Sequence, residues 1–193
     1  MASQPAHDER RRRIAELSCR VIATRGLSGL TIRTVAAEVG FSTAVVTHYF
    51  HNKRDLLLHT YEYAASRTIG RRGDSVEQLA DLWTILSRIL PIDDIAKENW
   101  RVFVAYWGAA SGDEELVLQH RSHVRSARAL IASRLPAEIE APEEVARRLL
   151  VTVMGISTQA IFDPDQWPPE RQLAVLAQSF ADAGLGKTIR PVE

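Results

Sequence analysis

The sequence predicts an all-α protein of about nine helices, with an N-terminal three-helix domain and a larger C-terminal helical domain. Three observations support this prediction. Apolar residues recur at helical spacing along the chain, without the alternation typical of β-strands. Two short helical patterns meet at Gly40. Basic residues gather before residue 55, whereas the rest of the chain is acidic.

Length and composition limit the class of protein. A chain of 193 residues that is 46% hydrophobic can form one large or two modest domains with buried cores. No stretch approaches the roughly twenty continuous apolar residues that span a bilayer, and the N-terminus is too charged for a secretory signal. We therefore expect a soluble, cytoplasmic protein without a membrane partner. Cys19 is the only cysteine, which excludes an internal disulfide and favours packing over thiol chemistry.

The first helix is expected to run from the charged segment 8–13 to about residue 25, after disordered residues 1–7. Its apolar stripe is Ile14, Leu17, Val21 and Ile22. The run Arg10–Arg13 has two interpretations, a solvated helix end or an arm that reaches a phosphate or a minor groove. Beside the motif described next, we favour the arm.

Residues 31–50 read TIRTVAAEVGFSTAVVTHYF and form the central motif. Ile32, Val35, Ala36 and Val39 share one helical face, and Thr31 is a suitable N-cap. Gly40 can take a positive φ and end this helix.

Ser42 is the expected N-cap of a second short helix. Its inward residues are Val45, Val46 and Tyr49, and its outward residues are Thr43, Ala44, Thr47 and His48. The outward side chains are small or polar, so this helix can approach the floor of a major groove. An ordinary helical corner is the alternative. Lys53 favours DNA binding, because it puts a cation where a phosphate would pass.

Charge separates the two parts of the chain. Residues 1–55 contain nine Lys or Arg and five Asp or Glu, a net charge of +4, so the remaining chain carries −4 because the total is zero. A basic head on an acidic body suits a protein in which the head alone attracts DNA.

The segment from Gly26 to Leu58 closely resembles the DNA-binding region of the TetR family of bacterial transcriptional regulators. The resemblance rests on these positions: Gly26 with Leu27, Thr31 with Ile32, Ala36 with Ala37, Gly40 with Ser42, Tyr49 with Phe50, and Lys53 with Leu56. It implies a dimer that binds a palindromic double-stranded DNA operator as a repressor and releases it when a small-molecule effector binds. DNA contacts are then expected from Thr31, Arg33, Ser42, Thr43, Ala44, Thr47, His48, Tyr49 and Lys53.

Thr47 departs from the family pattern. Most members carry a tyrosine at this position, which commonly touches phosphate, so the contact here must be made differently. The variant resembles the subgroup of the choline-responsive betaine repressor, in which a small hydroxyl residue stands at this position. The resemblance is strong over the first sixty residues, and beyond them it concerns helix number and order.

The remaining chain is expected to be helical throughout. A connecting helix from about residue 52 to 71 ends at the sequence GRRG, and five body helices follow at about 75–90, 92–110, 113–135, 142–162 and 168–183. The predicted domain ranges are 8–55 for DNA binding, 56–73 for the connection, and 74–186 for effector binding and dimerisation.

Aromatic residues cluster in the predicted body. Trp100, Phe103, Tyr106 and Trp107 lie close together on one helix, and Trp83 and Phe162 lie on neighbouring helices. They could be plain core or the walls of a cavity. Aromatic faces bind quaternary ammonium through cation–π attraction, worth up to about 2 kcal/mol per desolvated contact. The subgroup resemblance makes a cationic effector plausible, and the same walls would accept a hydrophobic one.

His120 and His123 stand one helical turn apart. No third ligand at a fitting spacing is evident, so we expect no metal and assign His120 to a polar pocket or a satisfied buried position. Met154 and Gln159 are further candidates for buried groups, which could equally line the effector pocket or lie in an interface.

The last two predicted helices have broad apolar faces. One carries Leu149, Leu150, Val153, Ile156 and Ala160, and the other carries Leu173, Leu176, Ala177 and Phe180. This breadth exceeds what one neighbour buries. Family members pair these helices with their twofold mates, and we expect the same homodimer here. An internal helix pair is the alternative.

Two other classes of function compete with a DNA-binding regulator. No phosphate loop, nucleophile elbow or metal set is present, so we expect no catalytic residue, no cofactor and no enzyme. A helical small-molecule-binding protein without specific DNA binding remains the main alternative. The sequence leaves open the effector, the operator, and the choice between repression and activation.

Overall fold

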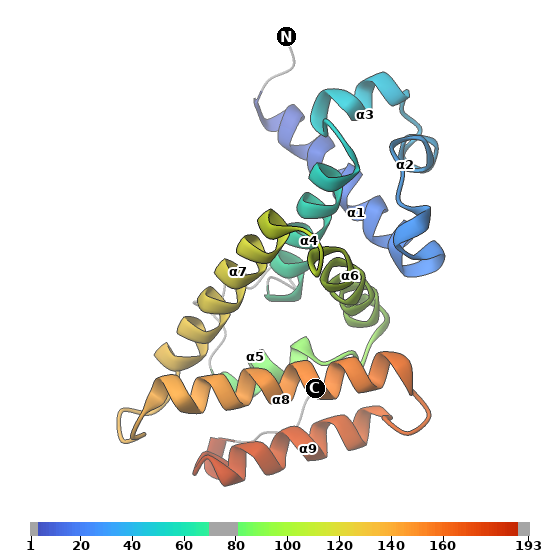
Figure 1. Ribbon diagram of the computed structural model, residues 1–193. Helices are drawn as coiled ribbons and strands as arrows, with labels where there is room; N and C mark the ends of the chain where they lie inside the picture. The colour runs from blue at the N-terminus through green and yellow to red at the C-terminus, as the bar shows by residue number, and fades with distance from the viewer. Residues whose placement is uncertain (1–3, 70–80, 189–193) are drawn as a thin grey trace. The chain divides into compact units, whose positions relative to one another are not determined.

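The computed structural model describes residues 4–69 and 81–188. Within these ranges the chain forms nine α-helices and no β-strand, which confirms the predicted all-α class (Figure 1). The helices are α1 (Gln4–Gly29), α2 (Ile32–Val39), α3 (Thr43–Tyr49), α4 (Lys53–Ile69), α5 (Leu82–Ile89), α6 (Asp94–Ala110), α7 (Glu114–Ser133), α8 (Pro142–Phe162) and α9 (Pro169–Asp182), followed by a 3₁₀ turn, η2 (Gly186–Thr188).

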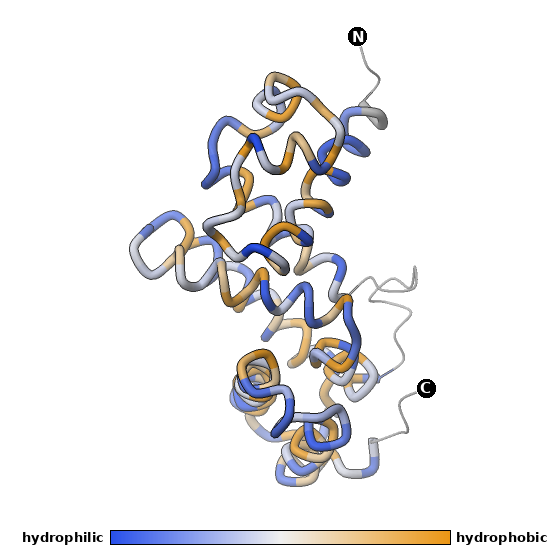
Figure 2. The backbone as a smooth tube through the Cα atoms, turned by 90° about the vertical axis from the view of Figure 1, so that its right-hand side faces the viewer, coloured by the Kyte–Doolittle hydropathy of each residue, from blue (hydrophilic) through white to orange (hydrophobic). Residues whose placement is uncertain are grey.

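The start of α1 differs from the prediction. Helix α1 begins at Gln4 rather than residue 8, so the described part of segment 1–7 is helical. Arg10–Arg13 therefore lie within a helix, and a contact of these residues with DNA stays a prediction. Arg12 and Glu9 stabilise this turn through an ion pair of 2.8 Å at spacing i,i+3. Figure 2 shows the hydrophilic first turns of α1.

Helices α6 to α9 begin and end within two residues of their predicted limits. The predicted first body helix, 75–90, is described only in part, as α5, because residues 75–80 lie outside the described ranges. The predicted boundary at residues 70–73 lies outside them too.

The described residues pack as two compact units. The first contains the residues up to Arg67 together with Arg101–Asp113, and the second contains Thr68–Trp100 and the chain from Glu114, as far as these are described. This division differs from the predicted domain ranges, because α4 and the second half of α6 belong with the N-terminal helices.

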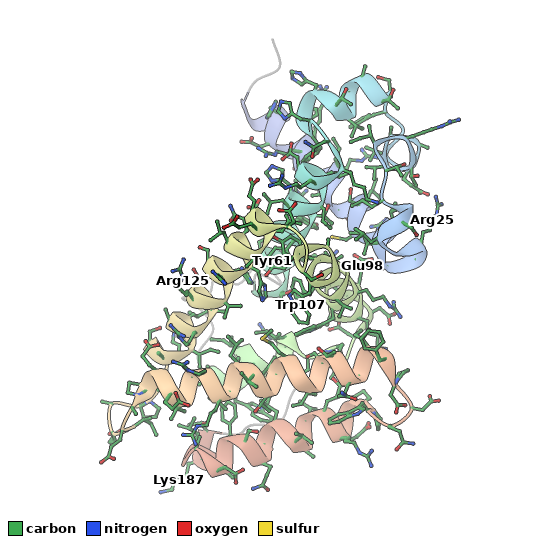
Figure 3. All side chains as sticks on the ribbon, viewed as in Figure 1. Arg25, Tyr61, Glu98, Trp107, Arg125 and Lys187 are labelled. Atoms are coloured by element: carbon green, nitrogen blue, oxygen red, sulfur yellow. The ribbon has the colours of Figure 1, made fainter. Side chains whose placement is uncertain are left out.

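The rings of Tyr61, Phe103 and Tyr106 explain this division. The Tyr61 ring on α4 stacks on Tyr106 with centroids 3.9 Å apart and meets the edge of Phe103 at 5.6 Å (Figure 3 labels Tyr61). Arg54 and Asp113 add an ion pair of 3.0 Å within the same unit. Stacked aromatic rings and an ion pair thus fix the second half of α6 to α4.

The core of the first unit also contains buried apolar residues of α1 to α4 and of the short segments that join them. Its fully buried members include Ile14, Cys19, Leu30, Val35, Val46, Phe50, Leu56 and Ala64. Cys19 is buried and its thiol lies 3.8 Å from the Thr60 carbonyl oxygen, as expected for a packing residue.

The second unit is centred on α8, which packs against α7 and α9. Figure 1 shows α8 and α9 running alongside each other. The Ser179 hydroxyl lies 3.4 Å from that of Thr152, and Arg128 pairs with Glu143 at 3.1 Å. By length and composition, α8 is also the one helix of the described ranges that could cross a membrane. A buried core helix has the same properties, and the packing of α8 against two neighbours fits that explanation.

Candidate nucleic-acid interface

The first helix of the motif, α2, begins at a capped residue. Thr31 has extended backbone angles, and its hydroxyl oxygen accepts the N–H of Thr34 at 3.0 Å. Val35, Ala36 and Val39 are buried, as their spacing predicted. Thr31 and Arg33 are exposed, so both are accessible at the protein surface.

Gly40 makes the turn of the motif. Its φ of 76° and ψ of 29° are left-handed, and the N–H of Phe41 donates to the Ala36 carbonyl at 3.0 Å while that of Gly40 donates to Ala37 at 3.3 Å. These two bonds are those of a Schellman motif, which satisfies the last carbonyls of a helix. The sequence therefore ends α2 abruptly and lets α3 start three residues later.

The second helix, α3, is capped by Ser42, whose hydroxyl accepts the N–H of Val45 at 3.2 Å. Val46 and Tyr49 face the core of the unit. The outward residues Thr43, Ala44, Thr47 and His48 are all exposed. A short helix is thus held by two buried residues and presents small or polar groups to the solvent.

Thr47 and Tyr49 are both engaged within the first unit. The Thr47 hydroxyl donates back into its own helix, 3.1 Å from the carbonyl oxygens of Thr43 and Ala44, so it offers a lone pair rather than a free proton. Tyr49 was expected to turn toward phosphate as well as inward. Only 8% of Tyr49 is exposed, so packing dominates its position.

Lys53 opens α4 and is exposed. Its ammonium donates to the Leu27 carbonyl at 2.7 Å, next to the kink at Gly26, where φ is 67°. An ammonium has three donors, so this bond orients Lys53 and leaves others for an anion. Arg25, labelled in Figure 3, pairs with Glu38 at 2.6 Å and joins α1 to α2.

Arg11, another arginine of the first unit, contacts residues of the same unit. Arg11 contacts the His59 ring and lies over the Phe50 ring at 5.7 Å. His59 is also 2.9 Å from Glu62 and 3.2 Å from Asp55. This cluster could not be predicted from the sequence, because Arg11 lies about forty residues or more from its partners in the chain.

His7 is the residue near the motif that sequence reasoning missed. It lies in α1, yet its ring is 4.6 Å from that of Tyr49 and 6.2 Å from that of His48. Its position beside the motif becomes visible only in the structure, where the start of α1 contacts the end of α3.

An exposed helix of small and polar side chains, set on a glycine turn within a net basic segment, defines a helix-turn-helix DNA-binding protein. A family model described as "Bacterial regulatory proteins, tetR family" matches residues 14–60, and one described as "BetI-type transcriptional repressor, C-terminal" matches residues 79–184. The chain belongs to the TetR family of bacterial transcriptional regulators, with a BetI-type C-terminal domain.

Individual relatives agree with the family. The transcriptional regulator BetI of Paraburkholderia phymatum is 29% identical over 190 residues, covering 93% of this chain and 94% of that protein. A transcriptional regulator from Rhodococcus sp. Rha1 has a TM-score of 0.78 at 25% identity, covering 94% of this chain and 99% of that one. A regulator from Saccharomonospora viridis, solved in complex with choline, has a TM-score of 0.70 at 22% identity, covering 90% and 96%.

The structure divides the predicted effector residues between the two units. Phe103, Tyr106 and Trp107 belong to the first, and Trp83, Trp100, His120, Met154, Gln159 and Phe162 belong to the second. Phe103 and Tyr106 are buried and contact Tyr61, which gives them a packing role in the first unit.

Within the second unit the predicted residues differ in burial. The Trp100 indole N–H donates to the Ile89 carbonyl at 2.7 Å. The Trp83 ring meets Phe180 edge to face at 5.3 Å, and its buried N–H has no hydrogen-bond partner among the described residues. Gln159 is exposed and Phe162 is 70% exposed, so neither side chain is buried within this unit, and an interface position of Gln159 stays a prediction.

Burial lowers the pKa of His120 by disfavouring its charged form. Burial likewise lowers the pKa of His123, and the neighbouring His120 lowers it further. Two neutral imidazoles therefore stand on α7 near pH 7. Within the described ranges, no group of three or more His, Cys, Asp or Glu could hold a metal ion.

The residues predicted to form the dimer interface fall into two groups by burial. Six are buried within the subunit itself, namely Leu149, Val153, Ile156, Ala160, Leu176 and Phe180. Leu150, Leu173 and Ala177 remain partly exposed. The burial of these six residues favours the alternative of an internal helix pair. Helices α8 and α9 already bury these side chains against neighbours in the same unit.

The exposed side of α8 carries other residues. Val151 is 62% exposed and Phe162 is 70% exposed, and Gly155 lies exposed between them with open space where a Cβ would stand. A shallow groove lies beside Val151 between α8 and α9, with Leu149, Thr152 and Ser179 in its lining.

Proposed function

We propose that this TetR-type regulator is a dimeric repressor, which holds a palindromic operator through α3 and releases it when a small molecule binds. The exposed outer face of α3 carries the proposal. Thr43, Ala44, Thr47 and His48 project from a helix that Ser42 caps and that Val46 anchors. Side chains of this size allow the helix to lie deep in a major groove.

The proposed contacts divide by chemistry. Thr43, Ala44, Thr47 and His48 are assigned to base edges. Thr31, Arg33, Ser42 and Lys53 are assigned to phosphates, which set the register on DNA and make binding salt-dependent. Tyr49, being 8% exposed, supports the helix more than it contacts DNA.

The decisive experiment combines Thr43→Ala, Thr47→Ala and His48→Ala in one variant. None of these side chains is buried, so the triple variant should keep its helical circular dichroism and its oligomeric state. We expect it to lose specific retention of the intergenic DNA upstream of its own gene at moderate salt. Equal retention of unrelated DNA by the natural protein, or full binding by the triple variant, would contradict the proposal.

The proposed dimer uses the exposed side of α8 with the adjoining side of α9. Val151 and Phe162 are large apolar groups left open to solvent, and Leu150 on α8 and Leu173 and Ala177 on α9 are partly exposed. Exposed apolar groups along one helix face favour a protein partner. A twofold dimer would set two α3 helices about 34–36 Å apart, or a multiple of this, to match a palindrome.

The effector is proposed to bind in the BetI-type part of the chain. Trp83 offers a buried indole N–H without a hydrogen-bond partner among the described residues, and His120 and His123 are imidazoles whose lowered pKa keeps them neutral near pH 7. Neutral and aromatic groups admit a cation without charge repulsion, and aromatic faces attract quaternary ammonium. Choline is bound by the regulator from Saccharomonospora viridis, which makes choline the first compound to test.

Tryptophan fluorescence tests this part of the proposal. Choline should be titrated beside 3,3-dimethyl-1-butanol, its uncharged analogue of the same shape. We expect saturable binding of choline, about tenfold or more weaker binding of the analogue, and loss of affinity in Trp83→Phe. Equal binding of both compounds would rule out recognition of the charge and leave a hydrophobic effector.

The relatives are named as transcriptional regulators, and we extend this to a non-enzymatic role in the bacterial cytoplasm. A small-molecule-binding protein without specific DNA binding is the competing function. The triple variant separates the two, since that alternative predicts no difference between operator and unrelated DNA.

A further inference from the structure

One stripe of α8 is exposed along most of the helix. Arg148, Val151, Gly155 and Phe162 lie on the same side of α8, and all four are exposed. The buried residues of α8 lie on its other sides, where α7 and α9 pack. The spacing of three, four and seven residues between members of this α8 stripe is typical of a helix that packs along a second helix.

Gly155 lies in the interior of α8, and packing within the subunit does not require a glycine there. No atom of another helix lies within 4 Å of the position that an added Cβ would take, and Gly155 does not have a positive φ. Glycine weakens a helix interior relative to alanine. A helix of another molecule that crosses α8 at this point would account for the glycine, because a missing side chain lets two backbones approach closely.

The N-terminal end of the α8 stripe offers a positive charge. Arg148 lines the groove between α8 and α9 together with Arg147 and Asp182. Arg147 pairs with Glu144 at 3.3 Å, and the Asp182 carboxylate accepts the side-chain N–H of Gln178 at 2.7 Å. Within the ranges that the structure describes, Arg148 makes no ion pair, so its charge is available to a carboxylate from another molecule.

The C-terminal end of the α8 stripe is acidic. Phe162 ends α8, and the next charged residues along the chain are Asp163, Asp165, Glu170 and Arg171. Phe162 and Asp163 are exposed. One carboxylate oxygen of Asp163 accepts a backbone N–H of its own loop at 3.4 Å, which leaves the other oxygen for a donor outside the loop.

We propose that α8 packs antiparallel against α8 of a second copy about a twofold axis at Gly155, so that Arg148 of each subunit contacts the partner's Phe162 and the partner's Asp163. The inference rests on the proposed function, because it specifies the dimer that would bind the operator. Arg148 and Phe162 each lie seven residues from Gly155, about 10.5 Å along the helix axis. A twofold axis at Gly155 therefore brings each of them opposite the other and forms the contact twice.

Each contact joins an apolar and a charged interaction. The aliphatic part of Arg148 covers the ring of the partner's Phe162, and its guanidinium reaches the carboxylate of the partner's Asp163. Val151 lies four residues from Gly155 and therefore faces the partner's Gln159, which is exposed within its own subunit. The dimer thus covers Val151 and Phe162, the two large apolar residues that α8 leaves open to solvent.

The test exchanges the charges of the proposed pair and follows dimer dissociation by analytical ultracentrifugation. Arg148→Glu alone and Asp163→Arg alone each place like charges in both contacts of a homodimer. We expect each variant to dimerise about tenfold or more weakly. A heterodimer of the two variants has opposite charges in both contacts, so we expect the mixture to form heterodimers of nearly natural affinity. An affinity tag on one variant identifies them by mass, and a chain that carries both changes should also recover.

Glu140→Arg is the matched control. Glu140 is exposed and precedes α8, and its replacement changes the charge by as much as Asp163→Arg does. We expect this variant to remain dimeric and to form no heterodimer with Arg148→Glu that is stronger than the one formed by the natural chain.

Two results would overturn the inference, namely single variants that dimerise like the natural protein, or weakened variants that do not recover when mixed. A monomeric natural protein would overturn both the inference and the proposed function. Dimers that respond to the charge exchange but bind operator no better than unrelated DNA would overturn the proposed function alone.

Discussion

At Gly40 the turn between α2 and α3 depends on the conformation of one residue. The backbone is left-handed at φ 76°, and no heavy atom lies within 4 Å of the position that an added Cβ would take. Any penalty for a side chain here therefore comes from the backbone angles and not from a clash.

We expect Gly40→Ala to lower the free energy of unfolding by about 1–2 kcal/mol. Gly112→Ala is the control, because Gly112 also has open space around its Cβ position but does not have a positive φ. Urea unfolding followed by circular dichroism measures both variants. Equal losses in the two would show that the left-handed angle at Gly40 carries no special cost.

Residues whose chemistry is local could be predicted from the sequence. The caps at Thr31 and Ser42 and the turn at Gly40 involve neighbours within five positions, and all three have the predicted conformations. His7 could not be found this way, because its partners Tyr49 and His48 lie more than forty positions away. The bond from Lys53 to the Leu27 carbonyl is a further long-range contact of this kind.

At the scale of one element, the apolar pattern of α8 does not predict which of its residues meet a partner subunit. Its apolar residues occupy several sides, and the sequence assigned Leu149, Val153 and Ile156 to a partner subunit. The structure buries all three within the subunit and leaves Val151 and Phe162 exposed. A helical period identifies faces, but it does not tell whether a face meets the same chain or another.

Helix α7 provides a prediction about pH. Burial lowers the pKa of His120 and His123, so the unfolded chain binds more protons than the folded one at mildly acidic pH. The stabilisation is fully present above the unfolded pKa of about 6.5 and is lost as the pH falls toward and through the lowered folded values.

We expect the free energy of unfolding, measured in urea, to be smaller at pH 5.5 than at pH 7.5. His123→Gln should reduce this difference, because it removes one of the two groups that gain a proton on unfolding. His51→Gln should retain it, since His51 is exposed. A pH difference that His123→Gln leaves unaltered would contradict this explanation.

At the scale of the whole molecule, the chain does not divide where its sequence suggests. The expected end of the connecting helix at the sequence GRRG places a boundary at residues 70–73, yet the second half of α6 packs with the N-terminal unit through Phe103 and Tyr106. These two residues were predicted as effector ligands because aromatic clusters look alike in a core and in a pocket. Their contacts with Tyr61 could not be read from spacing along one helix.

The proposed dimer makes a prediction at this scale. Val151→Glu and Phe162→Glu each place a charge on the exposed side of α8, which would be desolvated between subunits. We expect both variants to become monomeric in size-exclusion chromatography with light scattering, and their operator affinity to fall about tenfold or more as the two half-sites lose their linkage.

Leu118→Glu is the matched control for these variants. Leu118 is 54% exposed but lies on α7, away from the proposed face. The Leu118→Glu variant should remain a dimer. Dimers in all three variants would exclude this side of α8 from the interface.

The outer face of α3 has a consequence for how such a regulator changes over generations. Thr43, Ala44, Thr47 and His48 are exposed, whereas Val46 and Tyr49 supply the packing of this helix. Mutations at the four outer positions can therefore accumulate, because they remove no buried contact on which folding depends. A gene duplicate could acquire a new operator through a few such changes, while the rest of the protein is inherited unaltered.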